Sequence, residues 1–201
     1  RKFELRRSAV PEITLVFRRI RASYWSHWLM KTTIASIDIV IQDILKNDSD
    51  VIVFSAHPSL RSGSGVSGII HKAAGYELEA EAVKSAPLDI GGAIVTSGFA
   101  LKAKYVIHTV CPRYIYGNAE EESLLAQSYR SALSFSGVLE DAKSIAFVSL
   151  GTGVYRWPID RAAHIAMKEL LLSEFNSTFI CLTEKVTYSA YLKEYNKQIL
   201  K

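Results

Sequence analysis

The sequence predicts one α/β domain with a largely parallel central sheet that helices cover on both faces. Three observations support this fold class. From residue 34 onward, short apolar stretches alternate with longer stretches of helical periodicity, which is the pattern of strand–helix–strand units. Several of the apolar stretches are continuous, as in strands that are buried on both faces. The chain has 201 residues, 49% hydrophobic and 22% charged, which is enough for one well-buried domain.

Six strands are expected from these apolar stretches. The stretch "IDIVIQDI" alternates apolar and polar residues, as a half-buried strand does. The stretch "DVIVFSA" is a continuous apolar run between acidic residues and Pro58, so we expect a central strand buried on both faces. The other four stretches are similarly short and apolar. In chain order, the expected strands are residues 37–44, 50–56, 92–98, 105–111, 144–150 and 178–183.

Four helices are expected between and after these strands. In residues 68–85, the residues Ile69, Ile70 and Ala73 recur at a spacing that places them on one side of a helix. The stretch 120–142 opens with three acidic residues, which the positive end of a helix dipole favours. The expected helices are residues 68–85, 120–142, 161–175 and 189–201.

The positive charge of the chain is concentrated in its first 31 residues. This segment has eight Lys or Arg against two Glu, whereas the formal net charge of the whole chain is only +4. We expect residues 1–33 to form a basic extension that packs on a domain formed by residues 34–201. Its arginines are interleaved with Tyr24, Trp25 and Trp28, so an alternative is that it binds nucleic acid or an anionic membrane surface.

The two cysteines, Cys111 and Cys181, lie far apart in the chain and do not have the paired spacing of a zinc site or a disulfide framework. Although a single bridge between them is compatible with the sequence, this usage indicates a reducing compartment, the cytoplasm or the nucleus. No apolar run reaches the roughly 20 residues of a membrane span. Neither a metal nor a cofactor is expected. Because the sequence starts at Arg1, we expect it to be a segment of a longer protein.

Two glycine-bearing turns follow expected strands, at residues 59–68 and 151–155. In parallel sheets, ligands bind beyond the carboxyl ends of the strands. Bare backbone N–H groups beside a helix N-terminus can hold phosphate oxygens. The first turn lacks the Lys-Ser/Thr ending of a triphosphate-binding loop, so it favours a diphosphate over ATP hydrolysis. The alternative is that both turns only reverse the chain.

The order of these stretches resembles the macrodomain family of ADP-ribose-binding modules. The resemblance covers roughly residues 37–201 and rests mainly on "GSGVSGIIHKAAG", "VTSGFALKAKYVIHTVCP" and "SLGTGVYRWP". It implies a three-layer α/β/α fold with a mixed, mostly parallel central sheet. It also implies that the ligand is ADP-ribose, either free or attached to a mono-ADP-ribosylated protein.

The resemblance assigns ligand-binding roles residue by residue. Asp43 corresponds to the aspartate that accepts a hydrogen bond from the adenine amino group, and Ile44 contributes a backbone N–H group. The amides that hold the pyrophosphate correspond to Gly65, Val66 and Ser67. The second phosphate loop, whose aromatic end packs on the distal ribose, corresponds to Gly151, Thr152, Gly153, Val154 and Tyr155.

The chain also departs from the family pattern. Where many active macrodomains have "NAAN" at a strand end, this chain has "FSAH", so His57 replaces the asparagine that orients the distal ribose. Ser67 stands where one hydrolase class has an acidic residue. Leu182 replaces an aromatic residue that stacks on adenine, and Gln42 replaces a glycine.

These departures leave the question of catalysis open. We expect a module that binds ADP-ribose with weak or no catalysis. The alternative is a mono-ADP-ribosyl hydrolase or O-acetyl-ADP-ribose deacylase in which His57 is the general base, since histidine can exchange protons near neutral pH. His71 and His108 are expected to pack in the core.

Overall fold

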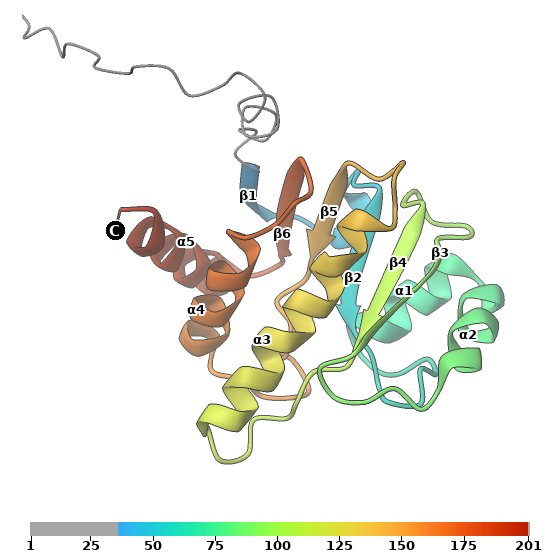
Figure 1. The fold of residues 1–201 in the computed structure, drawn as a ribbon, viewed down its shortest axis with the longest axis horizontal. Helices are drawn as coiled ribbons and strands as arrows, with labels where there is room; N and C mark the ends of the chain where they lie inside the picture. Colours follow the sequence, from blue (N-terminus) through green and yellow to red (C-terminus); the bar gives the residue numbers. More distant parts are fainter. Residues whose placement is uncertain (1–35, 201) are drawn as a thin grey trace, which may run out of the picture. The chain divides into compact units, whose positions relative to one another are not determined.

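The structure is a computed structural model that describes residues 36–200. These residues form a six-stranded sheet with the strand order β1-β6-β5-β2-β4-β3 (Figure 1). Neighbouring strands are parallel, except that β3 and β4 are antiparallel, so the sheet is mixed and mostly parallel as expected. The strands are β1 (Ser36–Ile41), β2 (Val51–Ser55), β3 (Ala93–Ser97), β4 (Tyr105–Thr109), β5 (Ser144–Phe147) and β6 (Ser177–Leu182).

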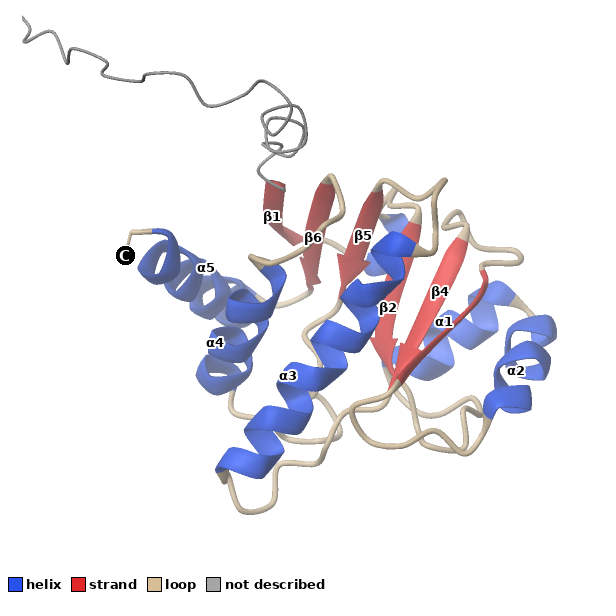
Figure 2. Ribbon diagram, in the orientation of Figure 1, coloured by secondary structure: helices blue, strands red, loops and turns tan. Residues whose placement is uncertain are grey.

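Helices cover both faces of this sheet, which confirms the three-layer fold (Figure 2). Helices α3, α4 and α5 contribute to the hydrophobic core on one face, and α1 and α2 contribute to the core on the other. The helices are α1 (Val66–Ala74), α2 (Tyr76–Ala82), α3 (Ala119–Leu133), α4 (Ile159–Leu170) and α5 (Lys185–Ile199).

Strand β2 shows why its apolar run is continuous. Its residues alternate between the two cores: Val51 and Val53 belong to the core under α3 and α4, whereas Ile52 and Phe54 belong to the core under α1 and α2. All four are at most 2% exposed. Successive side chains of a strand point to opposite faces, so a strand covered on both sides needs an apolar residue at every position.

Some element boundaries differ from the sequence-based expectation. The expected helix 68–85 is divided into α1 and α2 at Gly75, whose φ of 98° is left-handed and ends α1. The expected strand 37–44 ends at Ile41, because Asp43 caps a short 3-10 helix, Ile44–Lys46. Helix α3 ends at Leu133, earlier than expected, and α5 starts at Lys185, before the expected residue.

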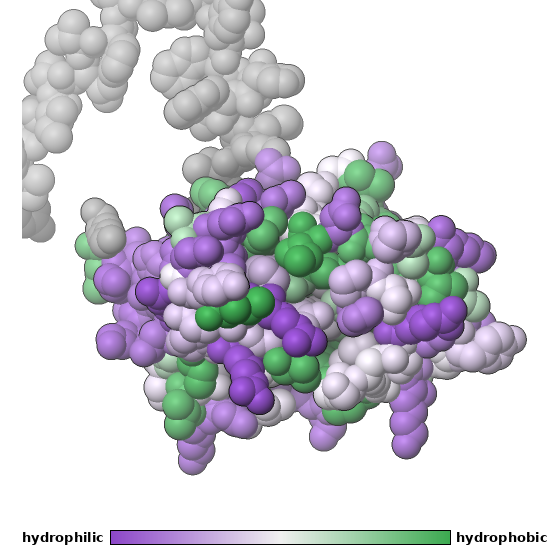
Figure 3. Space-filling view, turned by 90° about the horizontal axis from the view of Figure 1, so that it is seen from below, coloured by the Kyte–Doolittle hydropathy of each residue, from purple (hydrophilic) through white to green (hydrophobic). Residues whose placement is uncertain are grey.

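The parallel strands point toward one side of the domain, which Figure 3 views directly. Hydrophobic patches lie among hydrophilic side chains on this side. It carries the turns that follow β2 and β5, so the two glycine-bearing turns of the sequence lie on neighbouring strands. Strand order therefore brings together two motifs that are more than 80 residues apart in the chain.

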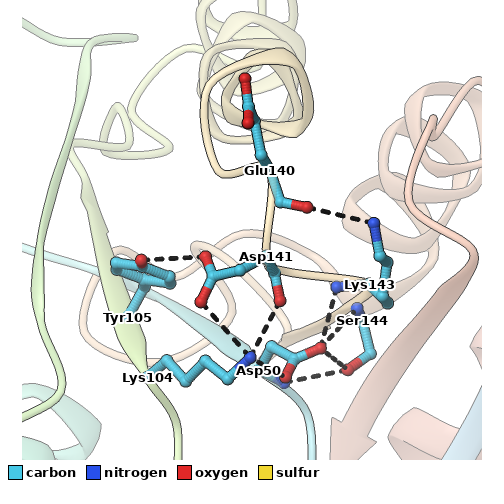
Figure 4. Close-up of polar contacts among 7 residues, drawn as sticks. All are labelled: Asp50, Lys104, Tyr105, Glu140, Asp141, Lys143 and Ser144. Atoms are coloured by element: carbon cyan, nitrogen blue, oxygen red, sulfur yellow. Dashed lines mark hydrogen bonds and ion pairs between the residues drawn. The ribbon is translucent and has the colours of Figure 1, made fainter.

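At the opposite side, where the strands begin, Asp50 anchors the starts of β2, β4 and β5 (Figure 4). One carboxylate oxygen accepts hydrogen bonds from the backbone N–H groups of Lys143 (2.9 Å) and Ser144 (3.1 Å), and the other lies 3.3 Å from the Lys104 ammonium. Desolvation acts to raise the pKa of Asp50, but these hydrogen bonds outweigh it and the pKa is lowered. This cluster lies away from the glycine turns and is structural.

His71 and His108 lie in the core under α1 and α2, as expected. Their rings pack around Phe54 and lie 5.9 Å from each other between centroids. His108 is fully buried, and its Nε2 atom lies 3.0 Å from the hydroxyl of Thr96. Burial, and secondarily the neighbouring His71, lower the pKa of His108 to about 3. His108 is therefore a neutral core residue at physiological pH.

The basic extension 1–33, its domain boundary and its nucleic-acid or membrane partners lie outside the described residues. Among residues 36–200, no helix combines the length and apolar character that crossing a membrane requires. In the same part of the chain, no three His, Cys, Asp or Glu side chains are grouped as metal ligands would be.

Candidate ligand-binding site

A cavity of about 540 Å³ lies at the carboxyl ends of β2, β4 and β5, on the side that Figure 3 shows. Its walls come from three segments that are distant in sequence: the turn after β2, the turn after β5 and, in the loop after β4, Arg113. Of the residues assigned to the site from sequence, the cavity is lined by His57, Gly65, Val66, Ser67, Gly151, Gly153, Val154 and Tyr155.

The turn after β2 forms one wall and leads into α1. Gly65 is the residue before the helix, with φ 62° and ψ −138°, a conformation that side chains with a Cβ rarely adopt. The first N–H groups of a helix have no acceptor within the helix. Those of Gly65, Val66 and Ser67 belong to residues that line the cavity, so they are available to an anionic ligand.

Packing fixes the position of this turn. The N–H group of Gly63 donates to the Ser67 hydroxyl at 3.3 Å, and the N–H group of Ser62 donates to the Glu79 carboxylate at 2.7 Å. A Cβ atom at Gly68 would lie only 2.4 Å from the carbonyl oxygen of Gly63, so the turn and α1 pack closely through glycine. Ser67 is buried, and its hydroxyl serves the turn itself.

The turn after β5 forms the facing wall. Gly151 has φ 84°, and a Cβ atom there would lie 2.6 Å from the Trp157 ring, so only glycine fits without rearrangement. The Trp157 indole N–H group donates to the carbonyl of Pro112 at 2.9 Å, which ties this turn to the loop after β4. Thr152 donates its hydroxyl to the carbonyl of Ser149 and does not line the cavity.

The side chain of Tyr155, at the end of the turn after β5, reaches the end of β2. Its hydroxyl donates to the Ala56 carbonyl at 3.3 Å, so it connects the ends of β2 and β5 over the cavity. Burial raises its pKa, and the nearby Arg113 acts in the opposite direction. The Arg113 guanidinium lies 5.9 Å from the centre of the Tyr155 ring. An aromatic wall with a cation beside it therefore closes one end of the cavity.

His57 lies exposed at the cavity wall with one ring nitrogen already engaged. The backbone N–H group of Ser59 donates to its Nδ1 atom at 3.1 Å, and the Ser59 hydroxyl lies 2.8 Å from the same atom. Because Nδ1 is an acceptor, the neutral ring carries its proton on Nε2. Nε2 can then donate a hydrogen bond to a ligand hydroxyl, but it has no lone pair with which to accept a proton. This geometry favours ligand orientation over general-base catalysis.

Asp43 and Ile44 lie outside the walls of the cavity, at the end of β1. Asp43 is exposed, and one of its carboxylate oxygens accepts a hydrogen bond from the backbone N–H group of Leu45 at 3.0 Å, while Ile44 is buried. Strand β1 pairs with β6, and the N–H group of Gln42 donates to the Leu182 carbonyl at 2.8 Å. Asp43 and the buried, aliphatic Leu182 thus lie at neighbouring strand ends: β1 is two strands from β5 and its glycine turn, and β6 pairs directly with β5.

The sequence analysis missed several residues of the cavity wall. Arg113 follows the end of β4, and Arg61, Ser62 and Ser149 belong to or flank the glycine turns. The signal for Arg113 was its position just after an expected strand, where parallel sheets place ligand contacts. Within the part of the chain that the structure describes, the cavity wall has two arginines and no Asp or Glu. Its electrostatic character suits an anionic ligand.

Two glycine turns that face each other across one cavity, at the carboxyl ends of a mostly parallel sheet, define an anion-binding α/β/α domain. The Macro domain family model matches residues 53–166. The chain belongs to the macrodomain family.

Sequence relatives and solved structures agree with this assignment. A macro domain-containing protein of Mesorhizobium japonicum is 38% identical over 171 residues, which cover 82% of this chain and 96% of that protein. A variant of the Oceanobacillus iheyensis macrodomain, solved with ADPR, has a TM-score of 0.79 and 36% identity, with 84% of this chain and 96% of that chain covered. The Trypanosoma brucei macrodomain in complex with ADP-ribose has a TM-score of 0.68 and 31% identity, over 78% of this chain and 68% of that chain.

Proposed function

We propose that this chain binds ADP-ribose, free or attached to protein, in the cavity between the two glycine turns. The observation that carries the proposal is the pairing of two amide-rich turns across a cavity whose described wall has two arginines and no carboxylate. A pyrophosphate offers hydrogen-bond acceptors and negative charge to these donors, and each charge-assisted hydrogen bond contributes about 1.5–3 kcal/mol. Macrodomains of O. iheyensis and T. brucei solved with ADPR or ADP-ribose support the same ligand.

The strand order supports one direction for the ligand along the sheet. Asp43 follows β1 at one end of the row, the two glycine turns follow β5 and β2 in the middle, and Arg113 follows β4. With the pyrophosphate between the turns, the adenine extends toward Asp43. The distal ribose then lies beside Tyr155 and His57, where Nε2 of His57 donates to a hydroxyl.

Calorimetric titration tests the proposed ligand. ADP-ribose is expected to bind at least tenfold more tightly than AMP, because AMP has a single phosphate and no distal ribose. Equal affinities for the two nucleotides, or no heat with ADP-ribose, would contradict the proposal.

The same protein incubated with a mono-ADP-ribosylated substrate is expected to release no ADP-ribose. Release that His57→Ala abolishes would instead establish the hydrolase alternative.

Asp43→Asn tests the adenine end of the site. The variant keeps an oxygen that can accept the Leu45 N–H bond but replaces the second carboxylate oxygen with an amide donor. We expect ADP-ribose affinity to fall about tenfold, since the adenine amino group loses a charged acceptor. Asp48→Asn is the matched control, because Asp48 is exposed and its ion pair with Lys102 lies outside the cavity wall. Equal affinities of the two variants would remove Asp43 from the site.

A further inference from the structure

The loop after β4, residues 113–117, carries exposed side chains that the proposed function does not use. Its first residue, Arg113, lines the cavity. Farther along, Ile115 is 64% exposed and Tyr116 is 82% exposed. The backbone N–H group of Tyr114 donates to the Tyr155 carbonyl at 2.9 Å, so this loop lies directly beside the second glycine turn. The exposed residues therefore adjoin the end of the cavity that the distal ribose would occupy.

The loop is held in place without the help of its exposed side chains. The buried Glu121 carboxylate accepts hydrogen bonds from the backbone N–H groups of Ile115, Tyr116 and Gly117, at 2.8–3.3 Å. Arg161 donates to the Gly117 carbonyl at 2.8 Å. These contacts engage the backbone and leave the side chains of Ile115 and Tyr116 facing solvent. A preordered surface of this kind binds a partner at a lower entropic cost than a flexible one.

The charge of the loop is also uncompensated. Within residues 36–200, Arg113 forms no ion pair, in contrast to Arg61, which pairs with Glu79 at 3.5 Å. Three acidic residues follow closely in sequence, and none pairs with Arg113: Glu120 is exposed, Glu121 binds the loop backbone and Glu122 pairs with Arg161 at 3.3 Å. An unpaired guanidinium next to an exposed isoleucine and tyrosine is complementary to a segment that offers carboxylates and apolar contacts.

We propose that loop 113–117 is the docking surface for the polypeptide that carries the ADP-ribose, and that Arg113 makes it favour acidic residues beside the modified side chain. The inference rests on the proposed function, which directs the distal ribose toward β4. A polypeptide attached to that ribose leaves the cavity past Tyr155 and Arg113. There its flanking residues meet the guanidinium first and then Ile115 and Tyr116.

Two synthetic peptides test the inference. Both carry one ADP-ribosyl group on the same central residue through a non-hydrolysable linkage, and they differ only in flanking Asp and Glu against Asn and Gln. The wild-type protein is expected to bind the acidic peptide about three- to tenfold more tightly at low salt, with a smaller ratio at high salt because exposed charges are screened. Arg113→Gln is expected to bring this ratio to about one. Lys168→Gln, which removes an exposed charge from the last turn of α4, is expected to retain it.

The double variant Ile115→Ser, Tyr116→Ser tests the apolar part of the surface. Neither residue lines the cavity, so affinity for free ADP-ribose is expected to stay within twofold of wild type, while both modified peptides bind more weakly. A wild-type protein that binds free ADP-ribose but does not distinguish the peptides would overturn the inference alone. So would an acidic preference that survives Arg113→Gln. Failure to bind free ADP-ribose would overturn the proposed function as well.

Discussion

Gly68→Ala is expected to weaken ADP-ribose binding at least tenfold and to lower the free energy of unfolding by about 1–3 kcal/mol, the usual range for overpacking. The added Cβ atom would lie 2.4 Å from the carbonyl oxygen of Gly63. The backbone fixes the position of a Cβ atom, and the carbonyl oxygen is itself a backbone atom, so no side-chain rotation relieves the contact. Either α1 or the turn before it must shift. Because that turn forms one wall of the cavity, the shift moves the amides away from the pyrophosphate.

Calorimetry with ADP-ribose and denaturant unfolding measure the two effects of Gly68→Ala. Gly137→Ala is the matched control, because a Cβ atom at Gly137 meets no atom within 4 Å and the position has no left-handed φ. It makes the same chemical change in a 3-10 helix that does not line the cavity. Wild-type affinity in Gly68→Ala would mean that the exact position of the first turn does not determine binding.

Acidification is expected to destabilise the domain through His108. Its pKa is about 3 in the folded protein, far below the ordinary histidine value of about 6.5 in an unfolded chain. Between these two values the unfolded chain binds one more proton than the folded protein. The contribution of His108 to stability is therefore fully present above about pH 6.5. Below that pH, this contribution to the free energy of unfolding decreases by about 1.4 kcal/mol per pH unit as the pH falls toward 3.

Denaturant unfolding at several pH values between 7 and 4 measures this effect. His108→Gln keeps a polar group that can reach the Thr96 hydroxyl but removes the titrating ring, so the loss of stability on acidification is expected to become shallower. Ile107→Val is the control, because it trims a buried residue on the same strand without changing any titratable group. Its stability is expected to be lower by a similar amount at every pH. Identical slopes for wild type and His108→Gln would exclude His108 as the source.

Much of the fold follows from local patterns in the chain. The continuous run "DVIVFSA" predicts β2, and the structure buries its residues in two cores, so the pattern and its cause agree. The expected strands all correspond to strands of the sheet. The predicted boundaries of helices and strands were less accurate, because each boundary depends on a single capping residue. Asp43 ends the strand before it and Gly75 ends α1, although hydrophobic periodicity continues past both.

Less of the site could be predicted, because contacts across the cavity connect distant segments. The glycine turns and His57 were found from sequence, and they line the cavity together. Arg113 was missed, since nothing in its local sequence indicates that β4 lies beside β2. The role of His57 also depends on a contact that residue type does not reveal: the Ser59 amide occupies Nδ1 and leaves the proton on Nε2.

The sequence by itself determined the alternation of strands and helices, the two glycine turns and the resemblance to macrodomains. These are encoded in hydrophobic periodicity and in residues that only a tight turn requires. Only the tertiary structure decided that β5 and β2 are neighbours, so that the two turns face one cavity. It also decided that Arg113 lies beside Tyr155, where the two side chains close one end of that cavity. Strand order arises from pairing between segments far apart in the chain, which local residue patterns do not specify.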